Sequence, residues 1–113
     1  MPRPQMQEPT FLILAALADG RKHGYALIQE AANMSEGRIV LKVGTLYAAL
    51  DRLAREGLIT RSGEEIADGR TRRYYELSGE GAEQLEAEVA RMRALAAQAA
   101  SRLRHRSSEA TAS

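Results

Sequence analysis

A short amphipathic helix that runs directly into a glycine-turned hairpin is the pattern that most constrains this chain, and it occupies residues 43–78. From about residue 45 to residue 56, apolar side chains recur at intervals of three and four, which places them on one face of a helix. Gly57 follows and is a typical residue at a helix end. The side chains expected to face the core are Leu46, Ala49, Leu50 and Leu53.

The hairpin is predicted from Asp68-Gly69, a dipeptide that favours a tight two-residue turn, with strands over residues 58–66 and 71–77. A two-residue turn fixes which positions face each other across the two strands, and here it creates three favourable charge pairs. These pairs are Glu65 with Arg72, Glu64 with Arg73, and Arg61 with Glu76.

One apolar pair does not fit this register, because Ile59 misses Leu77 by one position. A β-bulge at Gly63 would repair the mismatch by inserting one residue into a single strand. Alternation along the return strand places Tyr75 in the core and Tyr74 on the opposite face, where we expect it to pack rather than to bind a base.

Two further helices are expected before this segment. The first begins at Pro9 or Thr10, and it is apolar on more than one side, so the carboxy-terminal helix or another subunit must cover it. The second covers about residues 24–34. The β-branched residues 38–41 are expected to add a short third strand to the hairpin. The inward stripe of the second helix is expected to be Leu27, Ala31 and Met34.

Composition excludes several classes of protein. With 113 residues and a formal net charge of +1, the chain suits one domain plus an appendage, and general polybasic binding is not supported. Basic residues do gather locally, since residues 38–75 hold eight basic and five acidic side chains. The chain has no cysteine, which excludes disulfides and thiolate metal sites. Its longest apolar run, residues 11–18, is too short to span a bilayer, so we expect a cytoplasmic protein without membrane contact.

A long amphipathic helix is expected after Ser78, which is suited to cap it. Glutamates lie near its start and arginines near its end, which matches the helix dipole. This helix either folds back on its own domain or binds a second subunit. Because it extends well beyond the three helices and the hairpin, a second subunit is favoured. Its apolar stripe follows a 3.5-residue repeat at Leu85, Val89, Met92, Ala96, Ala99 and Leu103.

The predicted fold class is mainly α (α+β), a winged helix-turn-helix with a carboxy-terminal dimerisation helix. Four segments are expected along the chain. Residues 1–8 form a flexible arm, residues 9–78 the winged helix-turn-helix domain, residues 79–106 the dimerisation helix, and residues 107–113 a disordered tail.

The outward face of the helix over residues 45–56 carries small and hydrogen-bonding side chains, which suit a DNA major groove about 12 Å wide. Asp51 would accept a hydrogen bond from cytosine or pair with Arg55, four residues later. Alternatively, the helix has an ordinary solvated face and the wing arginines serve the hairpin itself. Arg70 escapes that alternative, because it lies at the turn with no carboxylate opposite, and it is the best candidate to enter a minor groove.

The chain resembles the PadR family of bacterial transcriptional regulators, named for the phenolic acid decarboxylase repressor. The matching motifs are HGYALIQE over residues 23–30, GTLYAALDRLAREGLI over residues 44–59, DGRTRRYYELS over residues 68–78, and the following Glu80-Gly81. The resemblance implies a homodimer that binds a pseudo-palindromic operator in double-stranded DNA, usually as a repressor.

Position by position, the resemblance assigns Lys42, Thr45, Tyr47, Arg70 and Arg72 mostly to phosphate contacts, which position a protein without specifying sequence. With the outward helix face added, the predicted DNA-binding residues are Lys42, Thr45, Tyr47, Ala48, Asp51, Arg55, Arg70 and Arg72. The predicted dimerisation residues are Phe11, Leu14, Leu85, Val89, Met92, Leu95, Ala96, Ala99 and Leu103.

No cofactor and no bound ligand are expected. Relatives that bind flat aromatic drugs use tryptophan, which this chain lacks, although Phe11, Met92 and Leu95 would suit an apolar cavity between subunits. A small-molecule effector is therefore possible but unsupported. An enzyme is not expected either, because His23 and His105 lie far apart in the sequence without a matched carboxylate. We expect His23 to lie at a helix start or to pack against neighbouring side chains. The alternative function is a winged-helix interaction adaptor that does not bind DNA.

Overall fold

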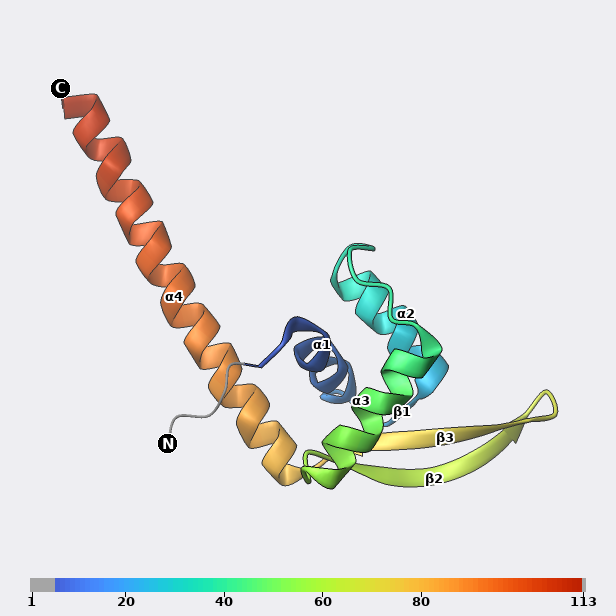
Figure 1. Ribbon diagram of the computed structural model, residues 1–113. Helices are drawn as coiled ribbons and strands as arrows, with labels where there is room; N and C mark the ends of the chain where they lie inside the picture. Colours follow the sequence, from blue (N-terminus) through green and yellow to red (C-terminus); the bar gives the residue numbers. More distant parts are fainter. Residues whose placement is uncertain (1–5, 113) are drawn as a thin grey trace.

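Figure 1 shows the computed structural model, which describes residues 6–112, with side chains described from residue 6 to residue 109. Within this part of the chain, three helices and a small antiparallel sheet form a domain from which a fourth, long helix departs. The arrangement confirms the predicted winged helix-turn-helix. The elements are α1 (Glu8–Leu17), β1 (Lys22–His23), α2 (Gly24–Met34), α3 (Val43–Arg55), β2 (Ile59–Ala67), β3 (Arg70–Leu77) and α4 (Gly79–Ala112).

The core lies where α1, α2 and α3 meet the base of the sheet, and the first turns of α4 close it. The inward face of α3 is confirmed, since its three leucines are fully buried and Ala49 is partly buried. On α2 the stripe is correct except at Met34, which is 45% exposed at the helix end, while Ile28 packs inward. The largest fully buried side chains are Tyr75, Ile13, Leu14, Leu17, Leu27, Leu46, Leu50, Leu53 and Ile59.

The hydrophobic helix α1 is covered within its own chain by α2 on one side and by α4 on another. Leu14 is fully buried and Leu85 is 9% exposed, both in the core of their own chain. Contacts within one chain thus account for the burial of both side chains, and their roles in dimerisation stay a prediction. Sequence periodicity finds an apolar face, but it does not say whether that face meets the same chain or another.

The wing is a hairpin of β2 and β3 whose turn residues Asp68 and Gly69 both have positive φ, +53° and +74°, as a tight two-residue turn requires. The predicted bulge is present between Arg61 and Glu64, and Gly63 has φ +89°. Beyond the bulge the predicted partners are correct, and Ile59 faces Leu77 as expected.

The bulge also overturns one predicted pair. Because it shifts every position before it by one residue, Arg61 lies opposite Tyr75, and Thr60 lies opposite Glu76. The same shift turns the Arg61 side chain toward the sheet face that carries Tyr75.

The third strand is β1, at the other edge of β3, rather than the predicted residues 38–41. Lys22 pairs with Tyr75, and His23 with Tyr74. Residues 38–41 form no strand; Ile39 and Leu41 turn inward onto the core while Val40 is 70% exposed.

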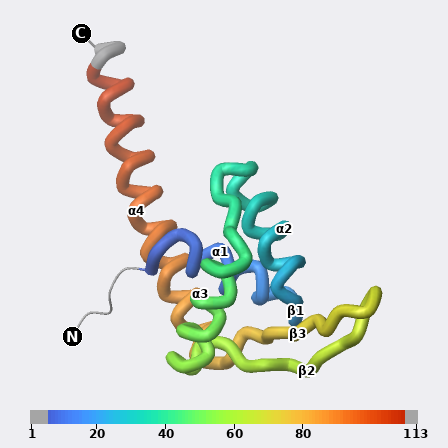
Figure 2. The backbone as a smooth tube through the Cα atoms, turned by 45° about the vertical axis from the view of Figure 1, so that its right-hand side comes forward, coloured from blue at the N-terminus to red at the C-terminus, as the bar shows by residue number. Residues whose placement is uncertain are grey.

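Helix α4 starts where Ser78 accepts a hydrogen bond from the Gly81 N–H at 2.9 Å and donates one to the Gly57 carbonyl at 2.6 Å. This confirms Ser78 as its cap. The helix then leaves the domain, and two views of the chain show its distal half apart from every other element (Figures 1 and 2). The described molecule is consequently elongated, 68 × 33 × 22 Å.

Both chain ends differ from expectation. Of the predicted flexible arm, residues 1–5 lie outside the described residues, but Met6 packs on the core and Glu8 begins α1, paired with Arg38. The predicted disordered tail is helical through Ala112, and only residue 113 lies outside the described part. That tail has no proline or glycine, and the His105–Glu109 ion pair at 3.0 Å supports its helix.

Candidate nucleic-acid interface

The outward face of α3 carries short or flexible side chains and is open to solvent. Thr45, Ala48, Asp51 and Arg55 are all exposed, as is Lys42 at the position that caps the helix. These residues include five of the eight predicted DNA contacts, and the structure brings them together on one surface.

Tyr47 lies at the margin of that face, 38% exposed. A Cβ atom added at Gly24 would lie 2.7 Å from the Tyr47 hydroxyl oxygen, so a larger residue there would require the Tyr47 side chain to move. The tyrosine side chain is thus held between two helices with its edge accessible.

Asp51 is paired across to the wing. Its Oδ1 lies 4.0 Å from Nη2 of Arg61, so the predicted partner, Arg55, is wrong. Both side chains are more than 60% exposed, and such a pair contributes little to stability. It does mark Arg61 as a cation beside the α3 face, which sequence reasoning missed because it did not apply the bulge shift to this residue.

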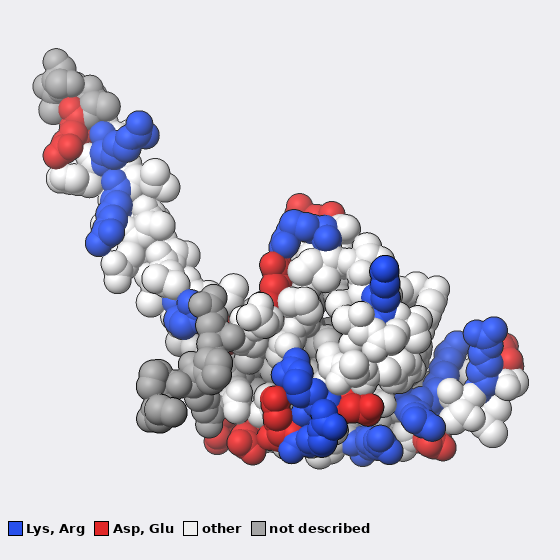
Figure 3. All heavy atoms as spheres, in the orientation of Figure 1, with Lys and Arg blue, Asp and Glu red and all other residues white. Residues whose placement is uncertain are grey.

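The wing carries cations out to its tip (Figure 3). Arg73 Nε lies 3.6 Å from Glu64, whereas Arg70 faces Ala67 in the register and forms no ion pair with any described residue. Arg72 lies opposite Glu65, as predicted. Arg70 and Arg72 are exposed on the sheet face opposite Tyr75.

Arg21 anchors the wing, a role that sequence reasoning missed. Its guanidinium lies 4.4 Å from the centre of the Tyr74 ring and donates a 2.8 Å hydrogen bond to the Ser62 carbonyl, beside the bulge. Tyr74 also packs edge to face on His23, with ring centres 5.4 Å apart. The predicted packing role of Tyr74 is confirmed. A hydrogen bond to Glu65 is the main cause that raises the pKa of Tyr74.

His23 has the structural role expected for it, because its Nδ1 accepts a 3.3 Å hydrogen bond from the Ala26 N–H and caps α2. Burial lowers the pKa of His23, as does the nearby Arg72 charge, and Glu65 opposes them in part. A neutral imidazole acceptor is the form that this cap requires.

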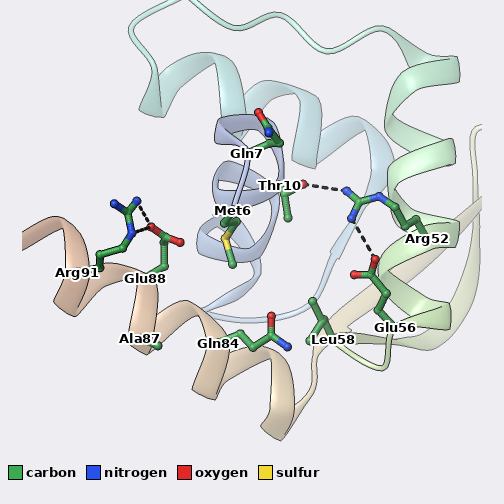
Figure 4. Close-up of a pocket in the computed structure, with 10 residues that line it drawn as sticks. All are labelled: Met6, Gln7, Thr10, Arg52, Glu56, Leu58, Gln84, Ala87, Glu88 and Arg91. Carbon is green, nitrogen blue, oxygen red and sulfur yellow. Dashed lines mark hydrogen bonds and ion pairs between the residues drawn. The ribbon is translucent and has the colours of Figure 1, made fainter. Parts of the chain in front are cut away.

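Figure 4 shows a cavity of about 680 Å³ between α1, the end of α3 and the base of α4. Its charged lining residues are engaged with each other. Arg52 donates to Thr10 at 2.8 Å and to Glu56 at 3.3 Å, and Arg91 pairs with Glu88. The charged residues of this cavity thus bind one another, while Met6, Leu58 and Ala87 supply apolar lining.

A second groove of about 640 Å³ lies between α1 and α4 and is more open to the outside of the molecule. Phe11, Leu12 and Met92 supply its apolar surface, and Glu88 and Arg91 lie along it. Of the three residues expected to line an apolar cavity between subunits, Phe11 and Met92 line this groove, whereas Leu95 lies outside it, 55% exposed on α4.

Among the described residues, no group of three or more His, Cys, Asp or Glu side chains could hold a metal ion. No helix in that part of the chain is long and apolar enough to cross a membrane.

A helix-turn-helix followed by a basic two-stranded wing defines the winged-helix class of proteins. Within that class, residues 13–87 match the family model of the transcriptional regulator PadR-like family. The match covers more than half of the chain, and the chain belongs to this family.

Solved structures and curated proteins agree. A PadR family regulator from Clostridium difficile R20291 superposes with a TM-score of 0.70 and 28% identity, over 86% of this chain and 99% of that one. Bacillus subtilis PadR, solved with operator DNA, gives a TM-score of 0.65 at 23% identity, over 74% of this chain and 47% of that one.

Among curated proteins, the transcriptional regulator Rv3488 of Mycobacterium tuberculosis is 39% identical over 69 residues, 61% of each chain. The uncharacterized protein X of Lysinibacillus sphaericus is 30% identical over 70 residues, which is 62% of this chain and 64% of that protein. The aligned region thus spans a little under two thirds of these relatives.

Proposed function

We propose that this protein is a cytoplasmic transcriptional regulator, which binds a pseudo-palindromic operator as a homodimer and acts as a repressor. The observation that carries the proposal is the open α3 face beside a wing whose tip arginine is unpaired among the described residues. Membership of the PadR-like family and the operator complex of the Bacillus subtilis relative support it. The proposed role is binding, not catalysis.

In this proposal α3 enters the major groove and the wing follows the adjacent backbone. Ala48, Asp51 and Arg55 lie nearest the bases, because they occupy the middle of the exposed face. The phosphate contacts come from the ends of the surface, through Lys42, Thr45, Tyr47, Arg70 and Arg72. Arg61 is added to these as a neighbouring cation, held by Asp51.

Salt dependence tests the proposal directly. Affinity for duplex DNA from the promoter of its own gene is measured at two salt concentrations. Phosphate contacts release counterions, so affinity should fall steeply as salt rises. An affinity that does not change with salt would favour an adaptor that does not use DNA.

Replacing Lys42 or Arg70 by alanine should weaken binding about equally on specific and nonspecific duplexes, and each should reduce the salt slope by about one. Fluorescence anisotropy over a salt series measures both quantities. Arg106→Ala is the matched control, because it removes an exposed cation on α4, away from the proposed DNA interface and beyond Leu103, the last predicted dimerisation residue. The contact assignment fails if both variants bind as tightly as the control.

Truncation after Arg91 should yield monomers whose operator binding is far weaker, because a single domain engages only one half-site. The cut keeps Leu85, which belongs to the domain core, whereas a cut at Glu83 would remove it. Sedimentation gives the oligomeric state and circular dichroism checks folding. A truncated chain that still sediments as a dimer would place the interface elsewhere.

A further inference from the structure

Asp51 is the only acidic residue of α3, and it lies in the middle of the helix face that is proposed to enter the major groove. Phosphates repel a carboxylate at such a position unless a cation lies close to it. The Asp51 side chain is 62% exposed, so packing inside the domain does not account for it. Its neighbours on the surface therefore decide what it can do on DNA.

The cation beside Asp51 comes from the wing. Nη2 of Arg61, on β2, lies 4.0 Å from Oδ1 of Asp51. Two other nearby arginines are engaged elsewhere, because Arg52 donates to side chains of α1 and of the end of α3, and Arg73 lies 3.6 Å from Glu64. Arg61 is thus the arginine that the structure places with the Asp51 carboxylate.

This pair lies where α3 meets the wing, close to the buried Tyr75. Burial raises the pKa of the Tyr75 hydroxyl, and the positive charge of Arg61 opposes that rise. Asp51 and Arg73 act on the same hydroxyl, so charges from α3, β2 and β3 converge on one point. The β-bulge causes this convergence, because it turns Arg61 to the sheet face of Tyr75.

The pairing leaves the Asp51 carboxylate open to a ligand. A separation of 4.0 Å is longer than a hydrogen bond, and Asp51 accepts no hydrogen bond from any described residue. Arg61 therefore offsets the negative charge without occupying the lone pairs of the carboxylate oxygens. Those oxygens can accept a hydrogen bond from a donor outside the chain.

The surface of α3 next to Asp51 suits a close approach to DNA. Ala48 and Gly44 precede Asp51 on the same exposed stripe, the first with one side-chain carbon and the second with none. A Cβ atom placed on Gly44 would meet nothing within 4 Å. Aspartate is short, so it reaches a base edge only when the helix backbone lies deep in the groove, which these small residues permit.

The chemistry of an open carboxylate selects one base. An ionised carboxylate accepts hydrogen bonds and donates none. In the major groove only cytosine and adenine present an amine donor, whereas guanine and thymine present acceptors. Adenine also presents N7, an acceptor that an amide side chain satisfies and that a carboxylate repels. Cytosine is therefore the base that fits Asp51.

We propose that Asp51 and Arg61 act together as a specificity-determining pair. Asp51 accepts a hydrogen bond from the N4 amine of a cytosine in each operator half-site, and Arg61 is the positioning residue that holds the carboxylate there. The inference rests on the proposed function and names a base that the operator contains. It also gives the wing a part in base selection, which it exerts through α3.

Selection from a library of random DNA duplexes tests the choice of base. The full chain and its Asp51→Asn variant each enrich their own sequences, and fluorescence anisotropy then gives relative affinities. The unmodified protein should require cytosine at one position of each half-site and lose about fivefold or more in affinity when T·A replaces C·G there. Asparagine pairs with N6 and N7 of adenine, so Asp51→Asn should change that preference to adenine at this position alone.

The contrary outcomes are distinct. Identical enriched sequences for the two proteins overturn the role of Asp51 and leave DNA binding intact. A variant that binds every duplex more tightly with an unchanged base preference also overturns it, because Asp51 would then only repel phosphates. A full chain that enriches no sequence overturns the proposed function itself.

The role of Arg61 is tested by the ratio of affinities for the C·G and T·A operators. Arg61→Gln removes the charge and should reduce this ratio by roughly two- to fivefold, and Arg61→Lys should restore much of it. Added to Asp51→Asn, the same Arg61→Gln change should leave the preference for adenine unaltered. Circular dichroism checks that these exposed substitutions leave the fold intact.

Arg73→Gln is the matched control, because Arg73 is an exposed arginine on the same sheet face but pairs with Glu64. This control should leave the ratio unchanged. If Arg61→Gln weakens binding to both operators equally, as the loss of a phosphate contact would, Arg61 does not position Asp51 and the proposed pair is overturned.

Discussion

The helices of the winged-helix domain and the distal part of α4 share an amphipathic sequence pattern, but they differ in how far their apolar side chains are buried. The domain buries complete leucine side chains on α1, α2 and α3 against one another. Past Val89 no described residue of α4 is buried, and its leucines are more than half exposed. The same amphipathic signal therefore marks a core in one region and an exposed surface in the other.

Paired leucine substitutions test this difference most strongly. Leu50→Ala should reduce the free energy of unfolding by about 2–5 kcal/mol, because it leaves a cavity in a fully buried site. Leu103→Ala, at a site 63% exposed, should leave the unfolding of the domain unchanged and affect only self-association. Urea denaturation at low concentration measures both variants. Equal destabilisation would mean that the two regions are not energetically distinct.

The junction between the regions is the next test. A Cβ at Gly81 would lie 2.0 Å from the Leu58 carbonyl oxygen, so Gly81→Ala must shift the start of α4 and should cost about 1–3 kcal/mol. Gly79→Ala is the control, because nothing lies within 4 Å of its added Cβ and alanine favours a helix by up to about 1 kcal/mol. Thermal melts compare the two. A neutral Gly81→Ala would show that α4 is not seated tightly on the domain.

The smallest expected effect is a pH dependence confined to the domain. The fold lowers the pKa of His23, so the unfolded chain binds a proton more readily and stability falls as the pH drops below about 6.5. His23→Asn keeps a capping side chain without the titration and should flatten the change in Tm between pH 7.5 and 5.5. His105→Asn on α4 should leave that change as it is. The assignment is refuted if both variants flatten it equally.

Local sequence rules predicted the wing well, because turn chemistry and cross-strand charge act over a few residues. Asp68-Gly69 located the turn, and the Ile59–Leu77 mismatch located the bulge at Gly63. The inward face of α3 followed from spacing alone. The proposed α3 contacts gather on one exposed face for the same reason.

Other features depended on tertiary context. Residues 38–41 include the β-branched Ile39 and Val40 and have strand propensity, but Ile39 and Leu41 point into the core. Lys22-His23 has no strand pattern, yet this dipeptide pairs with β3 because it passes the free edge of that strand. Periodicity could not tell that Leu14 and Leu85 belong to one core. Arg21 acts on the wing across 41 positions of sequence, a separation that no local pattern reports.

The position of β1 has a mechanical consequence. His23 ends the strand that binds β3 and also caps α2, so the first helix of the helix-turn-helix and the wing are joined through one residue. With Arg21 fastened to the bulge, the wing cannot turn independently of the helices. In the proposed complex, the wing and the helix-turn-helix would therefore meet DNA as one unit.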